Sequence, residues 1–285
     1  MKLVSHYREN EVLRNNFTQL AADIFGIDFT NWHEKGYWGD RYIPFSFADG
    51  DRIVANVSVN MLDFIIEGKS YKALQIGTVM THPEYRNKGL SASLMNHVLD
   101  VYEGNYDFIY LFANDSVLDF YPRFGFEEVE EYQYSTKVSA GQNPFILRKL
   151  DLARDLELIE KAVYGRVPVS QAFSTANSAG ITMYHILNVF PDHLYHHAEK
   201  DAIVIFTKDN GMVQLYDFIS TVPVDMKDIM AIFGDTATVQ FHFTPYDSDL
   251  QYQRFPFKRD GALFVKKRVG LEFPRFVKHP FTSEA

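Results

Sequence analysis

The chain has 285 residues, of which 46% are hydrophobic and 15% aromatic, and its formal net charge at pH 7 is −9. This length and apolar content suffice for a large buried core and predict two domains. The chain contains no cysteine, which excludes disulfides, thiol nucleophiles and cysteine-ligated metals. No apolar run approaches the ~20 residues of a membrane-spanning helix, and residues 1–7 lack a signal-peptide core. We therefore expect a cytoplasmic protein outside the membrane.

Charge is unevenly distributed along the chain. Residues 1–140 hold 12 Lys and Arg against 20 Asp and Glu, a net charge of −8, whereas residues 141–285 hold 16 against 17, a net charge of −1. The acidic first half disfavours nucleic acid as a partner. It favours a cationic substrate, although the same charge also serves solubility. The basic stretch from Arg254 to Lys278 is typical of a solvated edge.

The region before residue 70 predicts a helix followed by two antiparallel strands. Residues 9–25 carry apolar side chains at helical spacing. Strands are expected over residues 42–48 and 53–66, with a hairpin turn at Asp49-Gly50-Asp51 between them. An aromatic segment, residues 29–38, lies between the helix and the strands, where it covers an edge of the core or lines a pocket.

A strand over residues 71–80 runs into a short basic loop and then directly into an amphipathic helix. The loop carries Arg86, Lys88 and Gly89, and the helix shows Leu90, Leu94, Val98 and Tyr102 at helical spacing. Backbone N–H groups at a helix start point outward, and the helix dipole favours negative charge there. Two cations beside these donors predict a binding site for phosphate groups.

The segment Arg86-Asn87-Lys88-Gly89-Leu90-Ser91 resembles the Arg/Gln-x-x-Gly-x-Gly/Ala loop of the GCN5-related N-acetyltransferase (GNAT) family. That loop holds the pyrophosphate of coenzyme A, and Ser91 departs from its last position. The resemblance implies that acetyl-CoA is the acyl donor and that no metal is needed. It also implies that residues 29–38 border the acceptor pocket. The implied cofactor-binding residues are Val79, Met80, Thr81, Arg86, Asn87, Lys88, Gly89, Leu90, Ser91 and Asn114.

A second block has the spacing of the same family. Residues 106–113 read as a buried strand, Asn114-Asp115-Ser116 provide helix N-cap residues, and Phe120-Tyr121-Pro122-Arg123-Phe124-Gly125-Phe126 follows. This resembles the GNAT element Asn…Tyr-x-x-Phe/Leu-Gly-Phe. The resemblance implies that Asn114 contacts the pantetheine arm or the catalytic tyrosine, and that Tyr121 protonates the departing thiolate. Pro122 removes a helix N–H and predicts a bent or ending turn.

The general base is not evident from the sequence. Some GNAT members carry a glutamate on the strand before the loop, and alignment on Arg86 places Ala73 there. Glu67 stands at a probable hairpin tip, and Asp63 lies within a strand. Three routes remain open for deprotonation of the acceptor: ordered water, a group from the other half of the chain, or the Ala285 carboxylate.

The second half repeats the order of elements in a weaker form. Helices are expected over residues 152–164, 180–189 and 226–233, and strands over residues 202–207, 212–220 and 238–243. The first two strands are expected to form a hairpin that turns at Asp209-Asn210-Gly211. The corresponding loop, residues 222–227, has no glycine or arginine. We therefore expect a catalytic GNAT domain over residues 1–140 and a degenerate GNAT-like domain without a pyrophosphate loop over residues 145–285. This tandem arrangement is weakly similar to acetyltransferases of the enhanced-intracellular-survival type, in which the terminal carboxylate is the base.

These features together predict an α/β (α+β) protein with a mixed twisted sheet and helices on both faces. The function they favour is acetyl-CoA-dependent N-acetyl transfer to a primary amine on a small molecule or peptide, by direct transfer in a ternary complex. Two alternatives remain open: a non-catalytic coenzyme A-binding regulatory module, and a transferase for a longer acyl or an aminoacyl group. Histidines at residues 185, 193, 196 and 197 match no zinc spacing and predict a histidine-rich surface helix end. Oligomeric state is not predicted.

Overall fold

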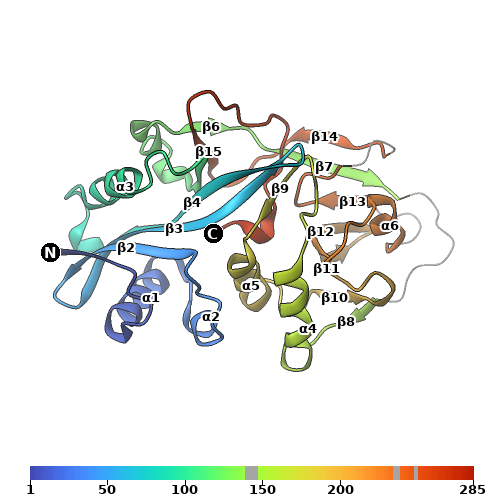
Figure 1. Ribbon diagram of the computed structural model, residues 1–285, viewed down its shortest axis with the longest axis horizontal. Coiled ribbons are helices and arrows are strands. Elements are labelled where there is room, and N and C mark those ends of the chain that lie inside the picture. The colour runs from blue at the N-terminus through green and yellow to red at the C-terminus, as the bar shows by residue number, and fades with distance from the viewer. Residues whose placement is uncertain (139–146, 234–237, 247–249) are drawn as a thin grey trace.

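The computed structural model describes residues 1–138, 147–233, 238–246 and 250–285. The chain forms two mixed β-sheets with helices packed between and around them (Figure 1). This confirms the predicted α/β class. None of the helices in these ranges combines the length and apolar content that a membrane crossing requires.

The first sheet contains eight strands. All neighbouring strands are antiparallel except β4 and β5, which are parallel, and β9 pairs with the far end of β3. In spatial order the strands are β1 (Lys2–Ser5), β2 (Tyr42–Asp49), β3 (Arg52–Ile66), β4 (Lys69–Thr81), β5 (Phe108–Ala113), β15 (Ala262–Lys267) and β6 (Glu127–Val129), with β9 (Phe173–Ala176) off this path.

The second sheet contains seven strands, and its single parallel pair among the described residues is β12 with β13. The hairpin between β11 and β12 turns at Asn210 and Gly211, both with positive φ, as the sequence predicts. In spatial order the strands are β14 (Gln253–Pro256), β7 (Tyr132–Lys137), β13 (Thr238–Phe241), β12 (Met212–Ile219), β11 (Ala202–Asp209), β10 (Leu194–His197) and β8 (Leu147–Lys149).

In the described part of the chain six α-helices accompany the sheets, and two of them begin at a residue whose side chain caps the first turn. The Asn10 side chain accepts a hydrogen bond from the Leu13 N–H at the start of α1, and Gly26 ends that helix in the left-handed conformation. Asp151 caps α4 in the same way through the Ala153 N–H. The helices are α1 (Glu11–Phe25), α2 (Thr30–Glu34), α3 (Leu90–Val101), α4 (Leu152–Gly165), α5 (Ala179–Asn188) and α6 (Met226–Ala231).

The two faces of the first sheet have different partners. Helix α3 packs Leu94, Met95 and Val98 on one face, in a core that also contains Ile76 and Leu111. A second core is shared by α1, α2, α4, α5 and strands of both sheets. The helices therefore join the two sheets into one body, with α4 and α5 lying between them (Figure 1).

The two sheets exchange strands along the chain. Strand β7 follows β6 directly but belongs to the second sheet, and β15 returns from the end of the chain to lie between β5 and β6. The domain division at residues 140–145 stays a prediction. Strand β7, which precedes it, belongs to the second sheet, whereas β9 and β15, which follow it, belong to the first. The basic stretch from Arg254 to Lys278 is not simply a solvated edge, because it contains β15 and ends at Lys278, whose side chain is buried.

Candidate active site

The basic loop has the geometry of an anion site. A 3₁₀ turn at Pro83–Tyr85 leads to Asn87 and Gly89, both with positive φ, and α3 begins at Leu90. The Lys88 ammonium donates to the Glu84 carbonyl at 3.0 Å and lies 4.6 Å from the centre of the Tyr85 ring. Loop residues 86–89 are exposed, so the first N–H groups of α3 face solvent beside two cations.

Strands β4 and β5 separate before β4 reaches this loop. Their pairing ends at Ile76 and Leu111. On its other side β4 carries a bulge: Thr78 and Val79 stand opposite Val57 alone, and Thr78 has a φ of 49°. A bulge re-aims backbone groups out of the ladder, and beyond Ile76 the described residues give β4 no strand partner on the β5 side. Val79, Met80 and Thr81, which the resemblance implies bind the cofactor, lie at this opening.

Tyr121 lies on the α3 face of the first sheet. It begins a 3₁₀ helix, Tyr121–Phe124, in which Pro122 occupies the first turn, as the sequence predicts. Its ring packs against Phe120 and Phe264. Within the described residues its hydroxyl has no hydrogen-bond partner, and burial raises its pKa to about 12. Tyr121 is therefore a protonated phenol at neutral pH.

Asn114 lies at the end of β5, immediately before the short 3₁₀ helix Asp115–Val117. It occupies the N-cap position, but its side chain makes no capping hydrogen bond. The side chain is exposed, and no described residue links it to Tyr121. Its assigned contact with the pantetheine arm therefore stays a prediction.

The chain's last residues lie on the opposite face of β4. A Cβ built on Gly77 would lie 3.5 Å from the carbonyl carbon of Ala285. In the amide orientation that its surroundings require, Gln75 donates to the Ser283 carbonyl and accepts from the Ala285 N–H, at 3.1 Å each. Gln75 and Gly77 alternate with Ile76, which belongs to the α3-side core. Ala285 and Tyr121 therefore approach the opening from opposite faces of the sheet.

A buried cluster of four charges holds this end of the chain, and we call Glu131, Arg259, Lys278 and Glu284 the tail clasp. Arg259 bonds both carboxylate oxygens of Glu284, at 2.9 and 3.1 Å, and pairs with Glu131. Lys278 lies 3.0 Å from Glu131 and 3.6 Å from Glu284. Arg259 and Lys278 hold the pKa of Glu284 below its usual range against its burial.

Neutral contacts complete the seating of the tail. The hydroxyls of Thr175 and Ser283 are 2.7 Å apart, and Thr282 donates to Asp217. His185 Nε2 lies 2.7 Å from the Glu284 carbonyl. His185 and His197 are both buried, and His197 lies on β10, so the prediction of a histidine-rich surface helix end is wrong for these two residues. The place of His185 on the inner face of α5 puts it against the tail.

One row of side chains crosses the tail-facing side of the first sheet. Tyr42, Asn60, Gln75 and Tyr110 stand directly opposite one another on β2, β3, β4 and β5. Residues opposed in this way have Cβ atoms ~5 Å apart. The Tyr42 hydroxyl also lies 3.1 Å from the Thr78 hydroxyl at the bulge. Polar groups therefore lead from β2 to the opening beside Ala285.

A cavity of about 450 Å³ lies at the outer end of this row. Tyr42 and Asn60 line it, together with residues of α2 and the segments around α4 and α5. The resemblance implies that residues 29–38 border a pocket. Two of them, Trp32 and Tyr37, line this cavity. Each is also largely buried in the core, so these aromatic side chains serve both roles.

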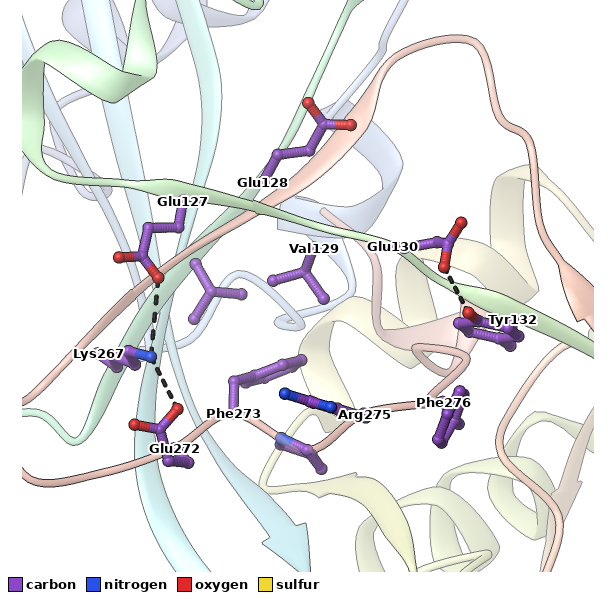
Figure 2. A pocket seen from close by; sticks show the side chains of 12 residues that line it. Glu127, Glu128, Val129, Glu130, Tyr132, Lys267, Glu272, Phe273, Arg275 and Phe276 are labelled. Carbon is purple, nitrogen blue, oxygen red and sulfur yellow. Dashed lines mark hydrogen bonds and ion pairs between the residues drawn. The ribbon is translucent and has the colours of Figure 1, made fainter.

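A separate cavity of about 430 Å³ lies at the edge strand β6, between β15 and residues 272–276. Figure 2 shows its acidic side chains largely engaged: Lys267 pairs with Glu127 and Glu272, and the Tyr132 hydroxyl donates to Glu130. None of the site residues predicted from the sequence lines this cavity.

The sequence does not identify the general base. The structure shows where its two acidic candidates, Asp63 and Glu67, lie relative to the opening. Asp63 accepts a hydrogen bond from Asn177 far along β3, and Glu67 stands in the β3–β4 turn with a φ of 49°. Neither lies at the opening. The tail clasp and the Gln75 contact escaped sequence reasoning, because their members come from distant segments. The available signals in the sequence were Glu131 and Glu284, and the position of Gln75 within a mostly apolar strand.

Comparison with known proteins agrees with this geometry. Residues 15–129 match the family model described as "Acetyltransferase (GNAT) domain". The chain is 40% identical over 86 residues to N-alpha-acetyltransferase 50 from Danio rerio, covering 28% of this chain and 51% of that protein. It thus spans about half the length of this curated relative.

Solved structures match the fold over nearly the whole chain. A probable N-acyltransferase from Enterococcus faecalis V583 has a TM-score of 0.62 at 16% identity, covering 93% of this chain and 72% of its own. Eis1 from Mycobacterium abscessus has a TM-score of 0.57 at 13% identity, covering 94% and 74%. At these identities the likeness concerns the fold alone, a mixed α/β fold like that of these structures. The match over residues 15–129 is thus to the GNAT acetyltransferase domain, and it supports an acyltransferase.

Proposed function

We propose that the protein transfers an acetyl group from acetyl-CoA to a primary amine by direct transfer in a ternary complex. The observation that carries this proposal is the arrangement around the β4–β5 opening. Tyr121 lies on one face of the sheet and Ala285 lies against Gly77 on the other. A donor thioester held in the opening has an acid on its thiol side and the polar row from Tyr42 to Gln75 on its acceptor side.

The donor is positioned by backbone groups and two cations. Arg86, Lys88 and the first N–H groups of α3 bind the pyrophosphate, with Asn87, Gly89 and Ser91 shaping the loop. The bulged segment from Thr78 to Met80 provides N–H groups to the acyl oxygen, whose negative charge grows in the transition state. Holding the thioester beside the amine in this way removes much of the entropic barrier.

The proton transfers follow from the two faces. The amine nitrogen forms its bond to the acyl carbon and gives its proton to ordered water on the tail-facing side of the opening, one of the routes left open by the sequence. The carbon–sulfur bond then breaks, and the thiolate takes the Tyr121 hydroxyl proton. The phenolate is reprotonated from solvent. This route is favoured over Asp63 and Glu67, because neither of these side chains lies at the opening.

The test measures thiol release from acetyl-CoA with a panel of primary amines. The wild type should release coenzyme A only when an amine is present, with an initial-rate pattern of intersecting lines that indicates a ternary complex. Parallel lines would indicate an acyl-enzyme instead. Binding of acetyl-CoA without thiol release for any amine would favour the alternative of a regulatory coenzyme A-binding module.

A further inference from the structure

The cavity between the first sheet and α5 differs in charge from the chain as a whole. The chain has a net charge of −9, yet the charged side chains that line this cavity are Asp40, Arg41 and Arg166. Asp40 is engaged by Arg8 at 2.9 Å. Arg166 is engaged by Asp217 through both terminal nitrogens, at 2.8 Å each. The lining thus carries one carboxylate, already paired with Arg8, against two guanidinium groups, which disfavours a second or third ammonium group.

The remaining walls are mostly aromatic and aliphatic, with Asn60, Asn177 and Ser178 as polar members. Rings of Trp32, Tyr37 and Tyr42 contribute to the lining, as do Met61 and Ile181. Burial raises the pKa of Tyr42 above its ordinary value, and the Tyr37 hydroxyl donates to Glu160 at 2.5 Å, so both phenols are neutral. Such walls favour an apolar or aromatic body and a single charge at most.

One polar group in the cavity lacks a partner. Asn60 is 4% exposed, and within the described residues its Nδ2 makes no hydrogen bond. A buried amide without a partner costs free energy that a ligand oxygen can restore. Asn60 stands opposite Gln75, whose amide contacts Ala285. A ligand oxygen on Asn60 would therefore lie beside the side chain that contacts the tail at the opening.

We propose that this cavity binds the acceptor, and that the acceptor is a monoamine with an aromatic or branched apolar body and a carbonyl-type oxygen near the amine, not a polyamine. The proposal rests on the proposed function, since it names the substrate class of the same site. It runs against the expectation of a cationic substrate drawn from total charge. The local charge decides, because interactions between exposed charges are screened beyond ~8–10 Å.

The experiment compares phenylalaninamide with spermidine on the full-length protein. Binding of each amine to the protein saturated with coenzyme A is measured by calorimetry, and kcat/KM is measured by thiol release with acetyl-CoA. Phenylalaninamide should bind and react at least about tenfold better. Equal or better binding of spermidine would overturn the proposal while leaving acetyl transfer intact. If phenylalaninamide binds as expected but no thiol is released, the acceptor class stands and the proposed function falls.

Two variants locate the effect in the cavity. Arg41→Glu should move the ratio of the two kcat/KM values toward spermidine by about tenfold, and Lys208→Glu, the same charge change on an exposed strand end of the second sheet, should not move it. Ala179→Phe fills the cavity and should raise KM for phenylalaninamide with KM for acetyl-CoA unchanged. An unchanged amine KM in Ala179→Phe would place the acceptor elsewhere.

Discussion

Gly77 and Ala285 are in contact across the tail-facing side of the first sheet, with 3.5 Å between the position of a Gly77 Cβ and the Ala285 carbonyl. This spacing accepts one methyl group at ordinary van der Waals distance but no branch. Gly77→Val should therefore displace Ala285 and lower kcat by roughly 100-fold, the cost of an ångström-scale misplacement. Gly77→Ala, the matched control, should stay close to wild type. Steady-state kinetics measure both; equal rates in all three proteins would show that the Ala285 position does not matter.

Tyr121→Phe removes the hydroxyl and keeps the packed ring. We expect kcat to fall by roughly 100-fold, the usual contribution of a general acid, with KM for acetyl-CoA within about twofold. Because burial raises the pKa of Tyr121 to about 12, the group stays protonated below that pH. The rate of the wild type should therefore show no loss from this group between pH 7 and 10. Unaltered turnover of Tyr121→Phe would remove it as the acid.

The pyrophosphate loop is tested by Arg86→Ala and Lys88→Ala together. Charge-assisted hydrogen bonds contribute ~1.5–3 kcal/mol each when well formed, and these side chains are exposed, so a total loss of roughly tenfold to 100-fold in acetyl-CoA affinity is expected. Calorimetric titration measures it. Lys72→Ala, which removes an exposed cation near the other end of β4, should bind acetyl-CoA like the wild type. Unchanged affinity in the double variant would refute the loop assignment.

Arg259→Met breaks the tail clasp. Glu131 and Glu284 would then share Lys278 alone in a buried setting, and loss of one partner from such a cluster costs about 3–5 kcal/mol. The free energy of unfolding in urea should fall by that order. In the folded protein kcat should fall further than KM for acetyl-CoA changes, because the tail next to Ala285 loses its anchor. Arg259→Lys should recover part of both; a variant with full stability and full turnover would contradict the clasp.

Stability should depend on pH through the buried histidine of the tail. Burial lowers the pKa of His279 to about 3, and its ring nitrogens lie 3.1 Å from the Pro280 carbonyl and the Tyr110 hydroxyl. The unfolded chain takes up a proton near pH 6.5, whereas the folded chain does not. Stability is thus complete above pH 6.5 and is lost as pH falls toward 3, by up to ~1.4 kcal/mol per pH unit. Urea unfolding at pH 7, 6 and 5 measures the slope, which His279→Gln should reduce.

The sequence predicted what depends on neighbouring residues. The helix start after Gly89, the turn at Asn210 and the 3₁₀ segment at Pro122 follow from local backbone preferences, and the structure has each where the pattern places it. The place of β15 was not predictable, because its short apolar run carries no mark of which edge it will join. The contact of Ala285 with Gly77 likewise depends on the completed fold of both sheets.

The return of β15 also bears on how the protein is made. Strand β5 lies between β4 and β15. Strand β15 is synthesised only after every strand of the second sheet has emerged, since the last of them, β14, ends at Pro256. A nascent chain that has reached β14 therefore exposes an unpaired β5 edge, which is a template for wrong pairing. Ribosome-bound chains should need shielding at this stage, and the catalytic centre is assembled last.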